Sequence, residues 1–100
     1  MISEKELNQA LSGAEVGKKF RCTPSPQATP VTIRTVLALN KAGVIQMSLT
    51  DSLDLFFAIN GQSQRSEIEI TIGRNFLLFG QQYFNLTLCG WLDKIEPVIG

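Results

Sequence analysis

Four stretches decide the fold that this sequence predicts: residues 31–39 (VTIRTVLAL), 44–50 (VIQMSLT), 66–72 (SEIEITI) and 83–92 (YFNLTLCGWL). In these stretches apolar residues recur at every second position, which is typical of strands with one buried face. We therefore predict a mainly β fold, with a β core over residues 31–92 built as an antiparallel meander of about six or seven strands. A meander of this length closes into a small barrel or folds into a two-layer sandwich.

The N-terminal segment predicts a helix over about residues 4–12. Ser3 and Glu6 have the spacing of a capping box, and Leu7 and Leu11 fall on one helical face. Gly13 supplies a C-terminal stop. This helix would plug one end of the β domain or cover one of its edges.

The remaining segments complete a predicted single domain over residues 1–100. Residues 18–23 form a further predicted strand, with Phe20 and Cys22 on its inward face. A Pro-rich loop follows over residues 23–30, because prolines at this density exclude a helix and a central strand. Residues 93–100 are predicted to be a C-terminal tail.

Composition argues against catalysis and against cofactors. The chain contains no histidine, the usual general base and the commonest metal ligand, and Asp51 and Asp54 are predicted to lie on a turn and on the polar face of a strand. Cys22 and Cys89 have apolar neighbours and are predicted to be buried thiols, with a disulfide between them as the alternative. We expect a protein that is not an enzyme and binds no metal or cofactor. With no secretory signal or membrane span, we expect it in the cytoplasm.

One strand face is predicted to be unusually aromatic. In the last predicted strand one face is apolar and the opposite face carries the aromatic residues. Phe56 likewise lies on the face opposite the core residues of its own predicted strand. Exposed aromatic side chains mark interaction sites, although both faces of the last strand could instead be buried. The candidate interaction surface consists of Tyr83, Asn85, Thr87, Trp91 and Phe56.

A second candidate surface is basic. Lys18, Lys19 and Arg21 surround Phe20, and Arg34 is predicted on the paired strand. Basic residues beside an aromatic residue on a β-barrel are typical of a single-stranded nucleic-acid groove of the OB type. The net charge of zero makes nucleic acid the weaker expectation.

A partial resemblance concerns the middle of the chain. Residues 43–45 (GVI), 53–61 (LDLFFAING) and 67–70 (EIEI) are similar in spacing to the surface-presentation-of-antigens domains of flagellar switch and type III secretion proteins. The resemblance implies a strand-rich, intertwined dimer. The chain departs from that pattern at Ser66, where the family has glycine, and lacks the helical stretch before the first glycine.

Taken together, the sequence predicts a small, non-catalytic binding or adaptor module that acts through protein–protein contacts. The alternatives are an OB-like domain that binds single-stranded nucleic acid, a barrel that binds a small ligand, and a dimerisation domain of the type III secretion or flagellar switch type. The expected partner is another protein, with a homo-oligomer as one form of it, and no membrane is involved.

Overall fold

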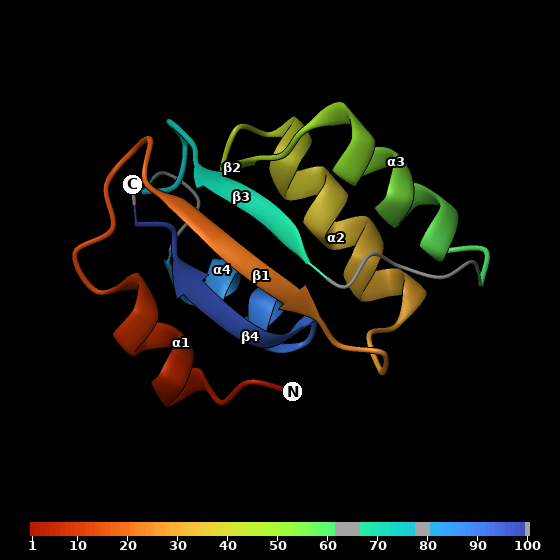
Figure 1. The fold of residues 1–100 in the computed structure, drawn as a ribbon, viewed down its shortest axis with the longest axis horizontal. Coiled ribbons are helices and arrows are strands. Elements are labelled where there is room, and N and C mark those ends of the chain that lie inside the picture. Colours follow the sequence, from red (N-terminus) through yellow and green to blue (C-terminus); the bar gives the residue numbers. More distant parts are fainter. Residues whose placement is uncertain (62–66, 78–80, 100) are drawn as a thin grey trace.

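The computed structural model describes residues 1–61, 67–77 and 81–99, in which four helices alternate with four strands. The elements follow the order α1 (Glu4–Leu11), β1 (Lys19–Pro24), α2 (Pro30–Lys41), β2 (Ile45–Gln46), α3 (Leu49–Ala58), β3 (Ile68–Ile72), α4 (Gln81–Cys89) and β4 (Leu92–Pro97). The fold is α+β, and Figure 1 shows the four strands as one open sheet.

The sheet has the strand order β2-β3-β1-β4, and every neighbouring pair is antiparallel. In the central pair Phe20 lies opposite Ile70 and Cys22 opposite Ile68. These side chains are buried, whereas the residues between them in sequence are exposed. The sheet therefore has one core face and one solvent face, as alternation in β1 and β3 predicts.

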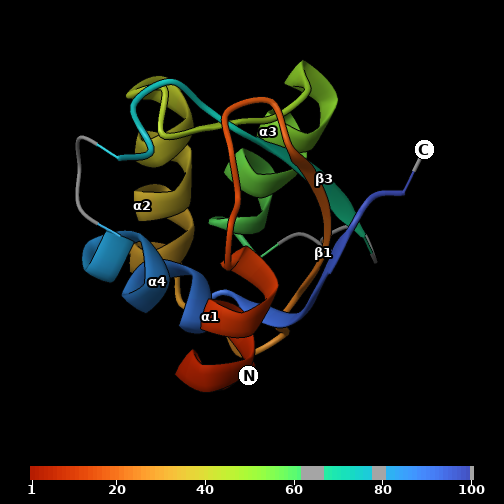
Figure 2. The same ribbon diagram turned by 90° about the vertical axis from the view of Figure 1, so that its left-hand side faces the viewer.

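Helices cover the core face. Figure 2 shows α1, α2 and α4 on one side of the sheet, and Figure 1 shows α3 beyond the β2 edge, beside α2. The core between these layers includes Leu7 and Leu11 of α1, Ile33 and Val36 of α2, and Trp91 after α4. Helix α3 thus lies at the periphery of the molecule, packed on α2.

The predicted mainly β fold is wrong, and the described residues form neither a barrel nor a sandwich. Three helices, over residues 30–41, 49–58 and 81–89, occupy much of the predicted β core. The predicted tail contains an edge strand, β4, which pairs with β1. The loop predicted over residues 23–30 is shorter, because β1 extends to Pro24 and α2 begins at Pro30.

Local capping explains why α2 and α3 are helical. The Thr29 side chain accepts a hydrogen bond from the N–H of Thr32 at 3.2 Å, and Pro30 occupies the first turn, where its fixed φ suits a helix. In the same way the Ser48 hydroxyl accepts a hydrogen bond from the N–H of Asp51 at 3.1 Å. These caps satisfy backbone donors that a strand would have to pair with a neighbouring strand.

Three predicted elements are confirmed. Strand β1 matches the strand predicted over residues 18–23, with Phe20 and Cys22 buried as expected. Helix α1 spans Glu4–Leu11, and Ser3 caps it by accepting from the N–H of Glu6 at 3.1 Å. Strand β3 shows the predicted alternation, with Ile68, Ile70 and Ile72 buried.

Candidate interaction surface

The most unusual surface of the described molecule is an apolar stripe on α3. It consists of Leu49, Leu53, Phe56 and Phe57, which follow one another at the i, i+4, i+7 and i+8 spacing of one helical face. Their exposed fractions are 75%, 45%, 54% and 44%. The two phenylalanine rings contact each other edge to face, with centroids 5.8 Å apart. We call these four residues the α3 stripe.

The inner face of α3 anchors the helix and fixes the direction of the stripe. Leu55 is fully buried, and Asp51 is buried. Asn40 of α2 joins the two elements, because its side-chain amide donates to the Ser52 hydroxyl at 3.2 Å and its carbonyl oxygen accepts from the N–H of Met47 at 3.0 Å. With this face held against the rest of the molecule, the α3 stripe faces outward.

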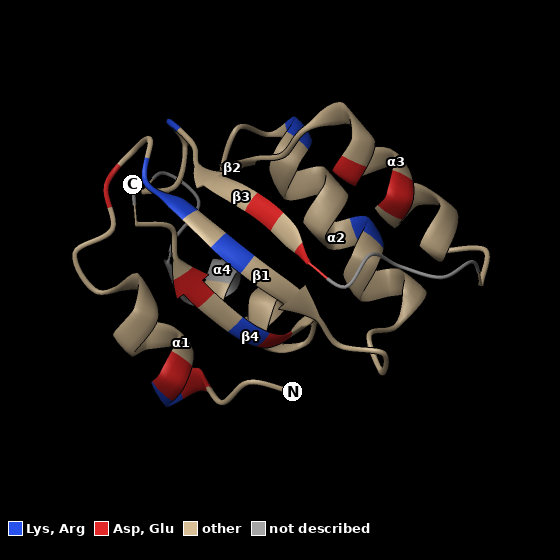
Figure 3. Ribbon diagram, viewed as in Figure 1, with Lys and Arg blue, Asp and Glu red and all other residues tan. Residues whose placement is uncertain are grey.

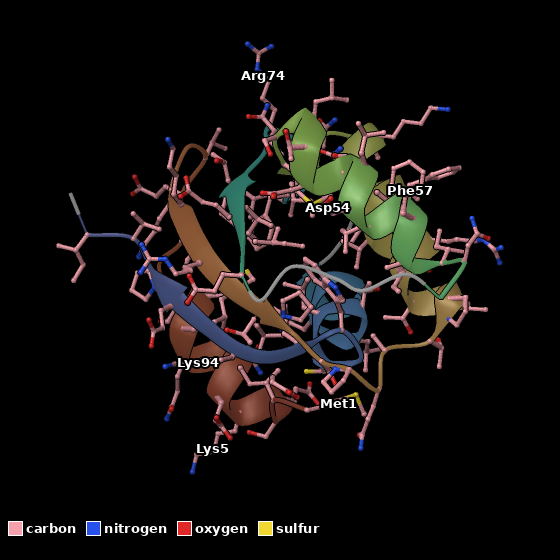
Figure 4. All side chains as sticks on the ribbon, turned by 45° about the vertical axis from the view of Figure 1, so that its right-hand side comes forward. Met1, Lys5, Asp54, Phe57, Arg74 and Lys94 are labelled. Carbon is pink, nitrogen blue, oxygen red and sulfur yellow. The ribbon has the colours of Figure 1, made fainter. Side chains whose placement is uncertain are left out.

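The charges of α3 lie away from the stripe. Asp51 and Asp54 are its only charged residues, and neither belongs to the exposed face, since Asp51 is buried and Asp54 half-buried. Figure 3 shows these two acidic positions on the α3 ribbon, and Figure 4 shows Asp54 and Phe57 as side chains of the same helix. The exposed face of α3 is therefore apolar and uncharged.

The predicted aromatic strand face does not exist, because residues 81–89 form α4. Trp91 follows this helix and is fully buried in the core, Asn85 is buried against α1 through a hydrogen bond to Asn8, and Thr87 is half-buried. Tyr83 lies in α4, and its side chain lies outside the described part of the structure. Phe56 is the predicted residue that the structure places in an exposed apolar cluster.

The predicted basic residues also do not form one groove. The Lys19 ammonium lies 3.9 Å from a Glu69 carboxylate oxygen, and Arg21 Nε lies 3.6 Å from Glu67. Glu69 of β3 and Glu67 directly before it thus partly offset the basic residues of β1, and Figure 3 shows acidic positions on β3 beside basic positions on β1. Lys18 lies over the Phe20 ring, 5.4 Å from its centroid.

Arg34 is not on a strand paired with β1. It lies on the exposed face of α2, on a different layer of the fold. The OB-like groove that motivated the basic set is therefore absent, because the barrel on which such a groove is built is absent.

A polar depression lies between α3 and the sheet. Its volume is about 430 Å³, and its lining includes Ser48 and Asp51 at the start of α3 and Glu69 and Thr71 on β3. Glu69 is already paired with Lys19. A second depression, of about 560 Å³, lies beside the C-terminal end of α1. Neither is the barrel interior in which a small ligand was expected.

The thiols are not activated. Burial raises the pKa of the Cys22 thiol far above its usual value. Burial also raises the pKa of Cys89, with a smaller contribution from the negative charge of Glu4. Both cysteines are free, so the alternative disulfide is not formed. Among the described residues no group of three or more Asp, Glu or Cys side chains is arranged to hold a metal ion.

The comparisons with known proteins add no relative. No protein-family model matches the chain, and neither curated proteins nor solved structures gave a match. The spacing that resembles surface-presentation-of-antigens domains requires a strand at residues 53–61, whereas Leu53–Ala58 belongs to helix α3. In the described part of the chain, none of the helices has the length and apolar character needed to cross a bilayer.

Sequence reasoning found Phe56 but missed the rest of the stripe. Under a two-residue period, Leu53 and Phe57 belong to the buried face and Phe56 to the opposite one. Under a helical period, all three share a face. The missed signal was the cap at Ser48, which has Asp51 three residues after it.

Proposed function

We propose that this protein is a small, non-catalytic binding module that acts through protein–protein contacts made by the α3 stripe. The observation that carries the proposal is the exposure of four large apolar side chains on one uncharged helical face. With side-chain areas of about 150–200 Å², their exposed fractions leave about 400 Å² of apolar surface in contact with water. Contiguous apolar surface of this size on a folded protein is often a binding site.

The chemistry of the described residues supports a non-catalytic role. The chain has no histidine, and the pKa of its buried thiol is raised rather than lowered. The basic side chains on the solvent face of the sheet are paired with glutamates. This face therefore attracts the phosphates of nucleic acid less strongly than an unpaired basic surface would. We place the protein in the cytoplasm, where free thiols such as Cys22 and Cys89 are ordinary.

A matched pair of substitutions tests the proposal. Leu53→Lys puts a charge in the middle of the α3 stripe, whereas Leu86→Lys makes the same change on α4 at a leucine that is 58% exposed. Affinity capture of a tagged chain from a native lysate that also contains the untagged chain identifies binding proteins, another copy of the chain included, and each is then purified and titrated directly against the purified chain.

The expected result is direct binding by the wild type and by Leu86→Lys, with at least about tenfold weaker binding by Leu53→Lys, because a lysine in an apolar contact must be desolvated. Circular dichroism confirms that both variants are folded. Equal binding by both variants would contradict the proposal, because the contact would then not pass through α3.

A further inference from the structure

We infer that the partner of the α3 stripe is a second copy of this chain, with two α3 helices packed antiparallel across a two-fold axis that passes beside Leu53. This inference rests on the proposed function and names its partner. Leu53 lies four residues after Leu49 and four before Phe57, so it is the midpoint of the stripe. In an antiparallel pair the leucine end of one stripe then meets the phenylalanine end of the other.

The stripe supplies most of the apolar area that such a dimer needs. A standard interface buries about 800 Å² on each partner, of which about 65% is apolar in homodimers. The apolar contribution required is therefore about 520 Å² per copy, of which the α3 stripe supplies roughly 400 Å². The polar remainder falls on the flanks, where exposed residues such as Thr50 and Asn60 border the stripe.

Charge also permits self-association. An interface between identical surfaces brings every residue near its own copy or near a residue of the same patch, so exposed charges risk like-charge repulsion. The exposed face of α3 carries no charge, because Asp51 is buried and Asp54 half-buried. The antiparallel arrangement in addition sets the positive N-terminal end of each helix dipole beside the negative C-terminal end of the other.

The mass in solution is the first test. Sedimentation equilibrium or light scattering at about 100 µM protein is expected to give twice the monomer mass of 11.0 kDa. Leu53→Lys is expected to weaken dimerisation at least about 100-fold, because two lysines would meet at the two-fold axis. Leu86→Lys on α4 is expected to remain a dimer.

Self-crosslinking tests the arrangement of the two helices. The background carries Cys89→Ser, and Cys22 is retained because it is buried. Leu53→Cys is expected to form a disulfide with its own copy. The axes of packed helices lie about 8–10 Å apart, and each Cα lies about 2.3 Å from its own axis, so facing Cα atoms come within disulfide reach. Leu49→Cys is expected not to do so, because an antiparallel pair separates the two copies of position 49 by about 12 Å along the axis.

Several results would overturn the inference, and they separate it from the proposed function. A wild-type protein that stays at 11.0 kDa excludes the second copy as partner. If a different protein then binds in a manner abolished by Leu53→Lys, the proposed function stands without this inference. A dimer that survives Leu53→Lys, or dissociates equally in Leu86→Lys, places the interface elsewhere. Equal crosslinking at positions 49 and 53 refutes the antiparallel arrangement.

Discussion

Replacing Trp91 tests whether this residue belongs to the core or to a surface. The indole is fully buried, and the backbone on either side is fixed, since the Trp91 N–H donates to the Leu88 carbonyl at 3.1 Å and the Trp91 carbonyl accepts from the N–H of Ser25 at 2.6 Å. Trp91→Ala is therefore expected to leave a cavity that the surroundings cannot refill. The loss is about 3–5 kcal/mol in the free energy of unfolding.

Trp91→Phe separates the effect of volume from that of polarity. Among the described residues the indole Nε1–H of Trp91 has no hydrogen-bond partner, and a buried donor without a partner costs about 1–3 kcal/mol. Phenylalanine removes this donor and keeps most of the ring, at a packing cost of about 1–2 kcal/mol. The two effects offset each other, so Trp91→Phe is expected to change the free energy of unfolding by less than about 1 kcal/mol.

Urea denaturation followed by far-ultraviolet circular dichroism measures both variants. It is carried out at one fixed protein concentration, because self-association would make apparent stability depend on concentration. A loss of about 4 kcal/mol in a domain of this size corresponds to a fall in melting temperature of about 15–30 °C. Trp91→Ala within about 0.5 kcal/mol of the wild type would refute the core placement. Trp91→Phe as damaging as Trp91→Ala would refute the argument from the unpaired donor.

Two further predictions concern backbone packing and thiol access. Gly73→Ala is expected to cost about 3 kcal/mol by thermal denaturation, because its Cβ would lie 2.2 Å from the Gly43 carbonyl oxygen, whereas the control Gly90→Ala, whose Cβ meets only ordinary contacts, is expected to cost less than about 1 kcal/mol. In alkylation followed by mass spectrometry, Cys89 is expected to react in the native protein and Cys22 only as fast as the protein unfolds, because Cys22 is fully buried. Labelling of both thiols at one native rate would contradict this burial.

The strands that the sequence predicts well are those whose alternation is chemically marked. In β3, Glu69 and Thr71 separate the buried isoleucines, and Glu67 continues the alternation just before the strand, so period two is the only periodicity that keeps both carboxylates in water. Helix α1 is likewise marked, by the reciprocal contacts of Ser3 and Glu6. In both cases polar residues, rather than apolar ones, identify the element.

Where the interior of a segment lacks charge, alternation misleads. Residues 31–39 contain one charged residue, Arg34, and their apolar side chains fit a period of two as well as a helical period. The structure buries Ile33, Val36 and Leu39, which are three residues apart. The caps at Thr29 and Ser48 distinguish the two periods, because a side-chain acceptor for backbone N–H groups favours a helix start. The strand prediction for these segments is wrong because it rests on two-residue alternation alone.

The apolar residues that make α3 hard to recognise as a helix from sequence also form its exposed stripe. A helix with apolar residues on two opposite faces needs a cover on each of them, because apolar surface left in water is unfavourable. Helix α3 has Leu55 on its inner face and the stripe from Leu49 to Phe57 on its outer face. It nevertheless lies at the periphery of the molecule, where its main packing partner is α2. The fold of one chain covers the inner of these two faces and leaves the stripe exposed. The composition of residues 49–57 therefore fits a helix that becomes interior when a second molecule covers it, and the two-fold pairing through Leu53 is the arrangement that supplies such a cover from the chain itself.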